Sequence, residues 1–175
     1  FDRKPRSTYT RYLIGDPFMR FYFDFLRPYK DKGNYVEHYF TNVILPSVRF
    51  QSWLGRSFEL LCLRHGERIA KILGFSGIQY SAGPWFQQGT RDRPQGVQLD
   101  LVFDRADKVL TVCEMKYRSE PIGREVIAEM EEKLSKTPFP ARRTVQKILV
   151  TRSPPSKDLL ASSYFSRIIQ ATELF

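Results

Sequence analysis

Cysteine and histidine are scarce in this sequence, which contains only two of each. Cys62 and Cys113 lie far apart, each within an apolar run, and no CxxC pair occurs. A disulfide framework is therefore excluded, and a structural zinc site is not expected. No apolar stretch approaches the roughly 20 residues of a membrane-spanning helix, and there is no signal-peptide core. We therefore expect a cytoplasmic protein without a membrane segment.

Acidic residues are in the minority. The 175 residues include 28 Lys and Arg against 19 Asp and Glu, which gives a formal net charge of +9. Such an excess favours a polyanionic partner, either nucleic acid or an acidic membrane surface. Apolar residues make up 42% of the chain, which excludes a disordered protein and suffices for the core of one globular domain.

Aromatic residues are concentrated at the start of the chain, where residues 1–53 hold 14 of the 25. Residues 8–14 favour a strand. Asp16 and Pro17 then predict a helix start, as N-cap and first helical residue. Apolar side chains recur at helical spacing from this start, which indicates an aromatic core face, with base stacking as the alternative: Phe18, Phe21, Tyr22, Phe25, Leu26 and Tyr29. A second helix is predicted over 35–45.

The rest of the chain alternates between helical and strand periodicity. From residue 55 the predicted order is α-β-β-β-α-β-α-β, which indicates an α/β fold with a mixed central sheet flanked by helices. The predicted elements are a helix at 55–71, strands at 78–81, 97–103 and 109–117, a helix at 122–136, a strand at 147–151, a helix at 156–165 and a strand at 167–172. The polar turn at 104–108 predicts an antiparallel hairpin.

One acidic residue interrupts the apolar strand 97–103. Side chains alternate between the two faces of a strand. The expected members of the apolar face are Leu99, Leu101 and Phe103. Gln98 and Asp100 are then expected to project from the opposite face.

A second acidic residue and a lysine interrupt strand 109–117. Glu114 and Lys116 project from one face, on the same side as Leu110 and Val112, and the hairpin brings Asp100 and Glu114 close to facing each other. Two neighbouring carboxylates repel each other and are costly to desolvate, and a divalent cation removes both costs. Carboxylate oxygens with retained waters suit Mg²⁺, and Lys116 is placed to position a water or to stabilise charge on a phosphate. The alternative is a salt-bridged sheet surface without a metal.

These residues resemble a known signature. Asp100, thirteen further residues and then Glu114-Met115-Lys116 resemble the motif of the PD-(D/E)xK nucleases, which share the restriction-endonuclease-like fold. Two segments add to the likeness: Gly55-Arg56-Ser57-Phe58-Glu59 resembles the helix-borne Glu of this fold, and Gly83-Pro84-Trp85 resembles its Gly-aromatic turn before the Asp strand.

A longer segment points to one branch of these proteins. Residues 12–21, Tyr-Leu-Ile-Gly-Asp-Pro-Phe-Met-Arg-Phe, resemble the stretch after the winged helix in archaeal-type P-loop ATPases, whose C-terminal domain is nuclease-like. The sequence has no GxxxxGK[ST] motif. The resemblance therefore implies that the winged-helix and ATPase domains lie upstream in the same protein, with 1–15 as a wing remnant, 16–54 as a helical connector and 55–175 as the nuclease-like domain.

The resemblance also implies roles for single residues. Asp100 and Glu114 are expected to hold Mg²⁺ or Mn²⁺, helped by the backbone carbonyl of Met115, while Lys116 orients the attacking water. Glu59 is expected as an accessory ligand or water-positioning group, with a solvated helix residue as the alternative. Gln98 occupies a position at which the ATPase-linked domains often carry an acid. Leu99 replaces the proline of the motif.

The expected function is metal-dependent hydrolysis of DNA phosphodiester bonds that leaves a 5′-phosphate. Four arginines are candidate contacts for DNA phosphates: Arg91, Arg93, Arg142 and Arg143. Two alternatives stay open. In the first, the chain acts as a catalytically silent DNA-binding or regulatory domain of the ATPase. In the second, its aromatic helices mediate self-association.

Overall fold

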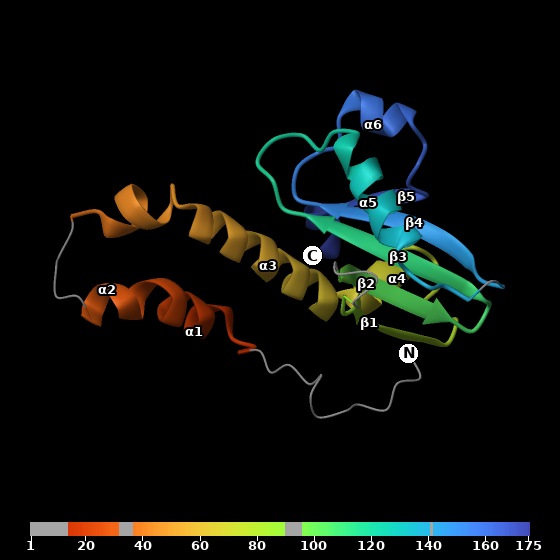
Figure 1. The fold of residues 1–175 in the computed structure, drawn as a ribbon, viewed down its shortest axis with the longest axis horizontal. Coiled ribbons are helices and arrows are strands. Elements are labelled where there is room, and N and C mark those ends of the chain that lie inside the picture. Colours follow the sequence, from red (N-terminus) through yellow and green to blue (C-terminus); the bar gives the residue numbers. More distant parts are fainter. Residues whose placement is uncertain (1–13, 32–36, 90–95, 141) are drawn as a thin grey trace. The chain divides into compact units, whose positions relative to one another are not determined.

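The computed structural model describes residues 14–31, 37–89, 96–140 and 142–175 (Figure 1). The predicted strand at 8–14 and the wing remnant lie almost wholly outside these residues. The chain divides into two compact units, Phe1–Ser52 and Trp53–Phe175. Each unit is described by itself below.

The first unit is helical and aromatic. Its described helical segments are α1 (Pro17–Phe21), a π-helical stretch at Tyr22–Leu26, α2 (Arg27–Asp31) and a π-helical stretch at Phe40–Ile44. Asp16 caps the first helix as predicted, because its carboxylate accepts the Met19 N–H at 2.7 Å.

Aromatic rings form the interior of this unit. Phe21, Phe25, Phe40 and Phe50 make ring contacts with centroids 5.2 to 6.3 Å apart. Phe25 and Phe50 are buried, whereas Phe18 is 65% exposed. The predicted core face is therefore correct for its middle and wrong for Phe18, which lies in the first turn of the helix and outside the cluster.

The helical stretch predicted at 55–71 is longer than expected and is interrupted. Helix α3 (Val48–Arg64) starts directly after Ser47, whose hydroxyl accepts the Phe50 N–H at 3.1 Å. His65 then breaks the helix, and α4 (Gly66–Ile72) follows. Gly74 ends it, with a positive φ of 78° that favours glycine.

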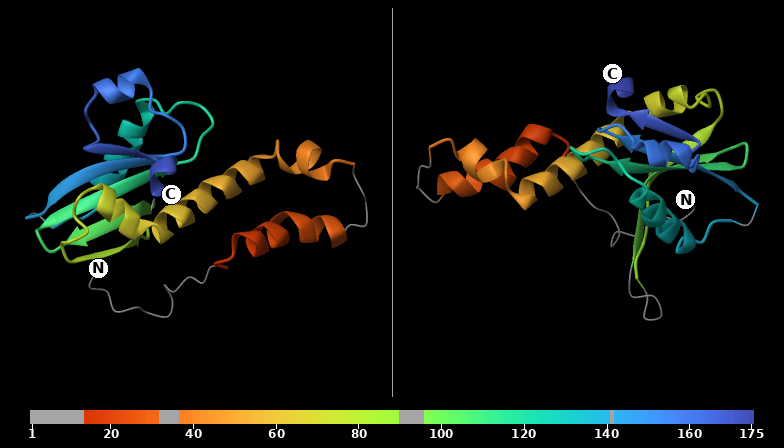
Figure 2. Two further views of the ribbon diagram at one scale, coloured as in Figure 1. Left: turned by 180° about the vertical axis from the view of Figure 1, so that it is seen from behind. Right: turned by 90° about the horizontal axis from the view of Figure 1, so that it is seen from above.

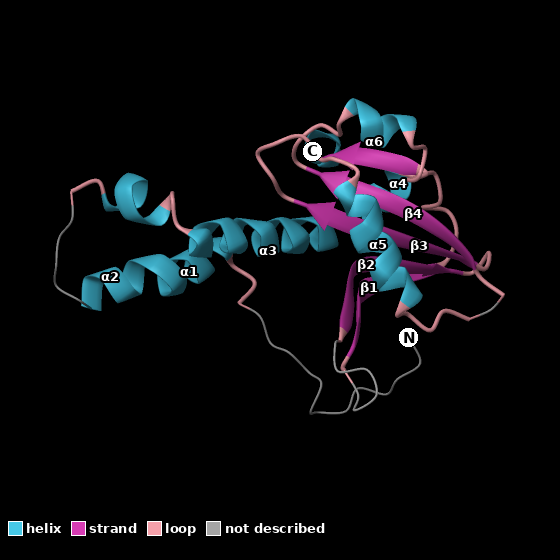
Figure 3. Cartoon of the chain, turned by 45° about the horizontal axis from the view of Figure 1, so that its top comes forward, coloured by secondary structure: helices cyan, strands magenta, loops and turns pink. Residues whose placement is uncertain are grey.

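Five strands form one mixed sheet in the order β1-β2-β3-β4-β5 (Figure 3). The strands are β1 (Tyr80–Gln87), β2 (Val97–Arg105), β3 (Val109–Lys116), β4 (Thr144–Thr151) and β5 (Arg167–Gln170). The first three are antiparallel, which confirms the predicted hairpin of β2 and β3, and the last three are parallel. Each parallel step needs a crossover, and the helices α5 (Glu125–Ser135) and α6 (Lys157–Ala161) provide it.

Helices cover both faces of the sheet, which confirms the predicted α/β class with a mixed sheet between helices (Figure 2). Phe58, Cys62 and Ile69 from α3 and α4 pack on one face with Phe103 and Cys113. On the other face, residues of α5 and α6 pack against different strand residues: Val126, Met130 and Leu159 against Val102, Val112 and Leu149. Along β3 and β4 the residues of each face are alternate positions, as the pleat requires.

Strand β1 extends beyond the predicted 78–81 and includes Gly83-Pro84-Trp85, where we expected a turn. This part of the prediction is wrong. The pairing of β1 with β2 shifts register between Gly83 and Trp85. Proline lacks an N–H and is tolerated in an edge strand at such an irregularity, so the Gly-Pro pair does not end the strand here.

The same register shift changes the face assignment on β2. Gly83 pairs with Val102 and Trp85 pairs with Leu99, so β2 has one more residue than β1 in this interval. This is a β-bulge. Leu101 then packs on the α3 side, but Leu99 packs on the α5 side. The prediction that Leu99 shares a face with Leu101 is wrong, because the extra residue interrupts the alternation.

Candidate functional site

The predicted acids lie where two strands separate. The paired residues of β2 and β3 run from Asp104 opposite Leu110 to Leu101 opposite Cys113. Asp100 and Glu114 follow directly on each strand. Asp100 Oδ2 accepts the backbone N–H of Met115 at 2.9 Å, so a side chain closes the end of this ladder. The bulge in β2 sets the position of the Asp100 carboxylate here.

Glu114 is the most deeply buried charged group of the site, with 1% of its side chain exposed. As predicted, it projects on the same side as Leu110 and Val112, toward α5. Both of its carboxylate oxygens accept hydrogen bonds from Lys133 Nζ at 2.7 Å. Lys116 Nζ lies 2.9 Å from Glu114 Oε1. Buried carboxylates require such partners, and here two lysines supply them.

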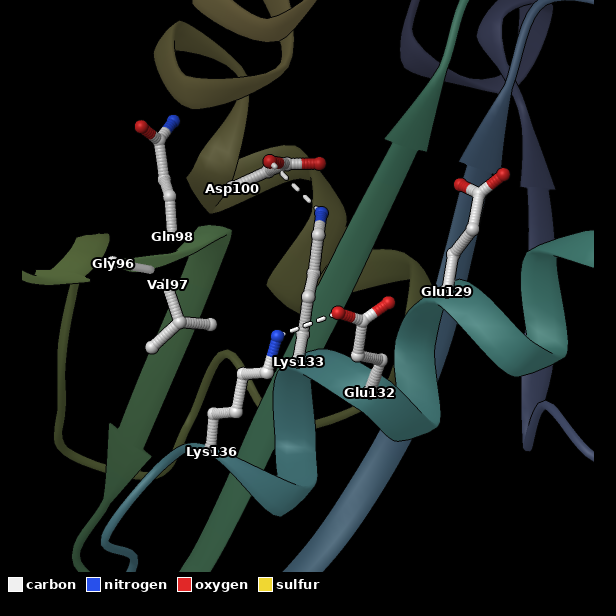
Figure 4. Close-up of a pocket in the computed structure, with 8 residues that line it drawn as sticks. All are labelled: Gly96, Val97, Gln98, Asp100, Glu129, Glu132, Lys133 and Lys136. Atoms are coloured by element: carbon white, nitrogen blue, oxygen red, sulfur yellow. Dashed lines mark hydrogen bonds and ion pairs between the residues drawn. The ribbon is translucent and has the colours of Figure 1, made fainter. Parts of the chain in front are cut away.

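Lys133 comes from helix α5 and joins the two acids. Its Nζ lies 3.8 Å from Asp100 Oδ1 in addition to its two bonds with Glu114. Figure 4 shows the long side chain reaching from the helix toward Asp100. The ammonium group thus lies between the two carboxylates. Val126 and Met130 lie on the buried side of the same helix and pack it against the sheet.

Lys116 is held between two acids. Its Nζ bonds Glu129 Oε2 at 2.5 Å as well as contacting Glu114. Burial alone lowers the pKa of Lys116, but the Glu114 charge and the hydrogen bonds with both acids outweigh it, and the pKa is raised. Lys116 is therefore a permanent cation at neutral pH, suited to stabilising negative charge rather than to accepting a proton.

Sequence reasoning missed Lys133 and Glu129. Both lie on α5, four residues apart, next to the buried positions Val126 and Met130. An acid–lysine pair bordering the apolar stripe of the helix after the Glu-x-Lys strand is a signal that the sequence does contain. By itself this acid–lysine pair predicts only a surface ion pair, because the docking of the helix decides which residues the two side chains contact.

Burial and like charges perturb the acids. The pKa of Asp100 is raised from its ordinary 3.8 to about 6, first by burial and then by the charge of Glu114, against the opposing effects of Lys133 and the Met115 N–H. Glu59 on α3 is half-buried, and burial raises its pKa too, with Lys133 lowering it and Glu114 raising it. The charges of Lys133 and Glu114 thus act on the pKa of Glu59, while its expected role as an accessory ligand or water-positioning group stays a prediction.

A cavity of about 610 Å³ opens between β2 and α5. Its lining contains both lysines and acids (Figure 4): Gly96, Val97, Gln98, Asp100, Glu129, Glu132, Lys133 and Lys136. Gln98 is exposed and lies on this lining, close in sequence to Asp100. The cavity gives Asp100 and Lys133 access to a ligand.

Of the predicted arginines, the two that the structure describes, Arg142 and Arg143, are not brought to the carboxylates. Arg91 and Arg93 lie outside the described residues. Arg143 pairs with Asp104 at 3.0 Å and donates to the Arg105 carbonyl at 2.8 Å, which ties the start of β4 to the β2–β3 turn. Arg142 is exposed beside it. The start of β4 pairs with Val109, five residues before Glu114 on β3. That separation is about 17 Å along the strand.

The two cysteines pack next to this site, one on α3 and one on β3. Cys62 and Cys113 are both free and buried. Burial raises the pKa of Cys62 to about 12, and the Asp100 charge adds to the effect. Thiols of this kind stay protonated and behave as small apolar core residues.

The donor set fits a hard divalent cation. Among the described residues, no three His, Cys, Asp or Glu side chains gather closely enough to hold a metal ion. Mg²⁺, however, is commonly bound by one or two carboxylates, with water and substrate oxygens as its other ligands. Asp100 and Glu114 offer two carboxylates with a cation, the Lys133 ammonium, already between them. The Lys133 ammonium group thus supplies the positive charge between the two carboxylates.

Comparison with known proteins shows little similarity. No family model and no curated protein matches the chain. A crystal structure of a protein of unknown function, AF1548, matches with a TM-score of 0.40 and 18% sequence identity, over 62% of this chain and 56% of that protein. The match thus spans little more than half of AF1548. No helix among the described residues is long and apolar enough to cross a membrane.

Proposed function

We propose that residues 53–175 form a metal-dependent nuclease domain with the restriction-endonuclease-like fold, which hydrolyses DNA phosphodiester bonds. The observation that carries this proposal is the pair of buried carboxylates, Asp100 and Glu114, at the point where β2 and β3 separate. Two lysines contact these buried acids. Asp100 and Lys133 line an open cavity, and Glu114 and Lys116 lie next to them. Clusters of buried, mutually perturbed ionisable groups are characteristic of functional sites.

Asp100 and Glu114 are the residues that hold Mg²⁺ or Mn²⁺ in this proposal. When bound, such an ion lowers the pKa of a water and polarises a phosphate oxygen. Lys116 carries a fixed positive charge next to Glu114 and is suited to orient that water and to stabilise the charge that develops on phosphate. Glu129 holds the Lys116 ammonium in place. Glu59 is suited to an accessory role from α3.

DNA is the proposed substrate because the chain is strongly basic and resembles ATPase-linked nuclease domains. In the proposed reaction, the water oxygen bonds to phosphorus, the bond to the 3′ oxygen breaks, and a 5′-phosphate is left. The candidate phosphate contacts stay Arg91, Arg93, Arg142 and Arg143, the last two for DNA beyond the cleavage site. The upstream winged-helix and P-loop ATPase domains and the cytoplasmic location belong to the same proposal.

A second candidate is a catalytically silent DNA-binding or regulatory domain. The favouring observation is that Lys133 and Lys116 together satisfy Glu114 without any metal. A buried carboxylate whose charge is balanced by lysines is able to serve in a structural ion-pair network.

Cleavage of labelled linear, single-stranded and supercoiled DNA in Mg²⁺ or Mn²⁺ tests the proposal. Asp100→Asn and Glu114→Gln should each lower the cleavage rate by about 100-fold or more, with DNA affinity largely unchanged. Glu132→Gln is the matched control, because Glu132 lines the same cavity but pairs with Lys136. Folding of each variant is checked by near-ultraviolet circular dichroism.

Each result decides between the candidates. Wild-type activity in the two site variants would refute the assignment of Asp100 and Glu114. DNA binding without cleavage of any DNA form with either metal favours the silent binding domain. DNA affinity that hardly changes with salt would count against a phosphate-dominated interface.

A further inference from the structure

We propose that Lys133 is an internal cation that competes with the divalent metal for Glu114 and Asp100. This inference rests on the proposed function, because that function places the metal on the same two carboxylates. It adds a built-in counter-ion: the ammonium group holds the acid pair together in the metal-free protein, and metal binding displaces it.

The Lys133 ammonium group already occupies the carboxylate oxygens that the metal would need. Lys133 Nζ contacts both oxygens of Glu114 at 2.7 Å, the bidentate position on this carboxylate, and lies 3.8 Å from Asp100 Oδ1. A metal ion bridging the two acids needs the same oxygens at still shorter distances. Two cations cannot occupy this position together, because each would displace the ligands of the other. Binding of the metal therefore requires the ammonium group to leave.

Lys133 borders a cavity into which its side chain can turn. Its side chain is 28% exposed and lines the cavity of about 610 Å³ between β2 and α5. A lysine stem has four rotatable bonds, so the ammonium can turn from the carboxylates into this cavity without a shift of the helix backbone. Glu114, by contrast, is fixed in the buried end of the site with 1% of its side chain exposed.

Lys133 differs from the other lysines nearby in the acids that it contacts. Lys116 is anchored by a second acid, Glu129, so it stays in place when Glu114 takes another partner. Lys136 lines the same cavity one turn further along α5 and pairs with Glu132. Lys133 is the lysine that bridges the two proposed metal ligands.

Mn²⁺ binding without DNA, measured by isothermal titration calorimetry, tests the exchange. Lys133→Met removes the competing charge and keeps most of the apolar stem. We expect its Kd for Mn²⁺ to fall about tenfold or more relative to wild type, since close charge pairs in buried sites couple by at least this factor. Lys136→Met, the matched control on the same helix and cavity, should stay within about twofold of wild type.

Thermal unfolding supplies the second readout. Without metal, Lys133→Met removes the ammonium group that Glu114 and Asp100 share, so its Tm in EDTA should lie below that of wild type. Saturating Mn²⁺ should raise its Tm by more than it raises the wild-type Tm, because the ion replaces the missing ammonium. Lys133→Arg keeps the charge and should show neither the tighter binding nor the larger shift.

The outcomes separate this inference from the proposed function. Unchanged or weaker Mn²⁺ binding by Lys133→Met, with wild type binding the metal, overturns the competition alone. A Lys133→Met protein that is unfolded even in saturating Mn²⁺ overturns it as well. Absence of metal binding by wild type and by Lys133→Met overturns the proposed metal site, and the inference with it.

Discussion

Replacing Asp100 by asparagine should stabilise the metal-free protein at neutral pH. The Asp100 side chain is 8% exposed, and its pKa is raised from 3.8 to about 6, first by burial and next by the charge of Glu114. The ionised form is thus unfavourable in the folded state. Asparagine is neutral, has nearly the same shape and retains a carbonyl oxygen to accept the Met115 N–H.

The pKa shift sets both the sign and the size of the effect. Between pH 3.8 and about 6 the unfolded chain has lost the Asp100 proton while the folded protein still holds it, so stability falls as the pH rises through this window. Above pH 6 the loss is complete. A difference of about two pKa units corresponds to about 3 kcal/mol. Asp100→Asn should therefore gain up to about 3 kcal/mol at pH 7.5 and nearly nothing at pH 3.8.

Urea unfolding in EDTA between pH 4 and pH 8 measures this difference directly. The free energy of unfolding of wild type is subtracted from that of Asp100→Asn at each pH, so that the effects of all other titrating groups cancel. Asp107→Asn, at an acid paired with Arg105 in the β2–β3 turn, controls for the substitution as such. A variant less stable than wild type at pH 7.5, or a difference that does not change with pH, refutes the reasoning.

Two further predictions concern acids whose surroundings differ from those of Asp100. Glu114→Gln should destabilise the metal-free protein by about 3 kcal/mol in urea unfolding, because Lys133 and Lys116 lose a buried partner; a loss below 1 kcal/mol would contradict a buried pair. Glu173→Gln should show the opposite pH dependence to Asp100: the Gln170 N–H lowers the pKa of Glu173, so the stability it contributes at neutral pH is lost as the pH falls through the folded-state value. Equal effects of Glu173→Gln in acid and at neutral pH would argue against this account.

The contrast between Asp100 and Glu114 follows from how each is paired. Glu114 accepts three close contacts from two ammonium groups, whereas Asp100 has one backbone N–H and an ammonium at 3.8 Å. Asp100 is thus a residue whose charge opposes folding in the absence of a metal. Under the proposed function, this cost is the trade-off between stability and activity that is expected at an active site.

Local patterns in the sequence predicted much of the sheet. Alternating apolar residues identified β2, β3 and β4, and the polar turn joined the first two in the observed hairpin. The face shared by Glu114 and Val112 was also predictable, because β3 keeps its alternation without interruption. These features depend on residues close together in the chain.

The errors have a different origin. Leu99 packs on the opposite face to Leu101 because the pairing with β1 inserts a bulge, and alternation within one strand cannot reveal this. Gly83-Pro84 suggested a turn, but an edge strand tolerates both residues. Helix α3 begins at Val48 rather than at residue 55 because Ser47 caps it.

Strand periodicity and turn chemistry act over a few residues, so they suffice to predict one basic α/β chain with two acids and a lysine on adjacent strands. The contacts of those charges depend on how distant elements pack together. Lys133 lies 19 residues from Glu114 along the chain, yet its ammonium group reaches both Glu114 oxygens. That contact exists because the apolar face of α5 docks on the sheet, and buried charges then take the partners that the docking supplies.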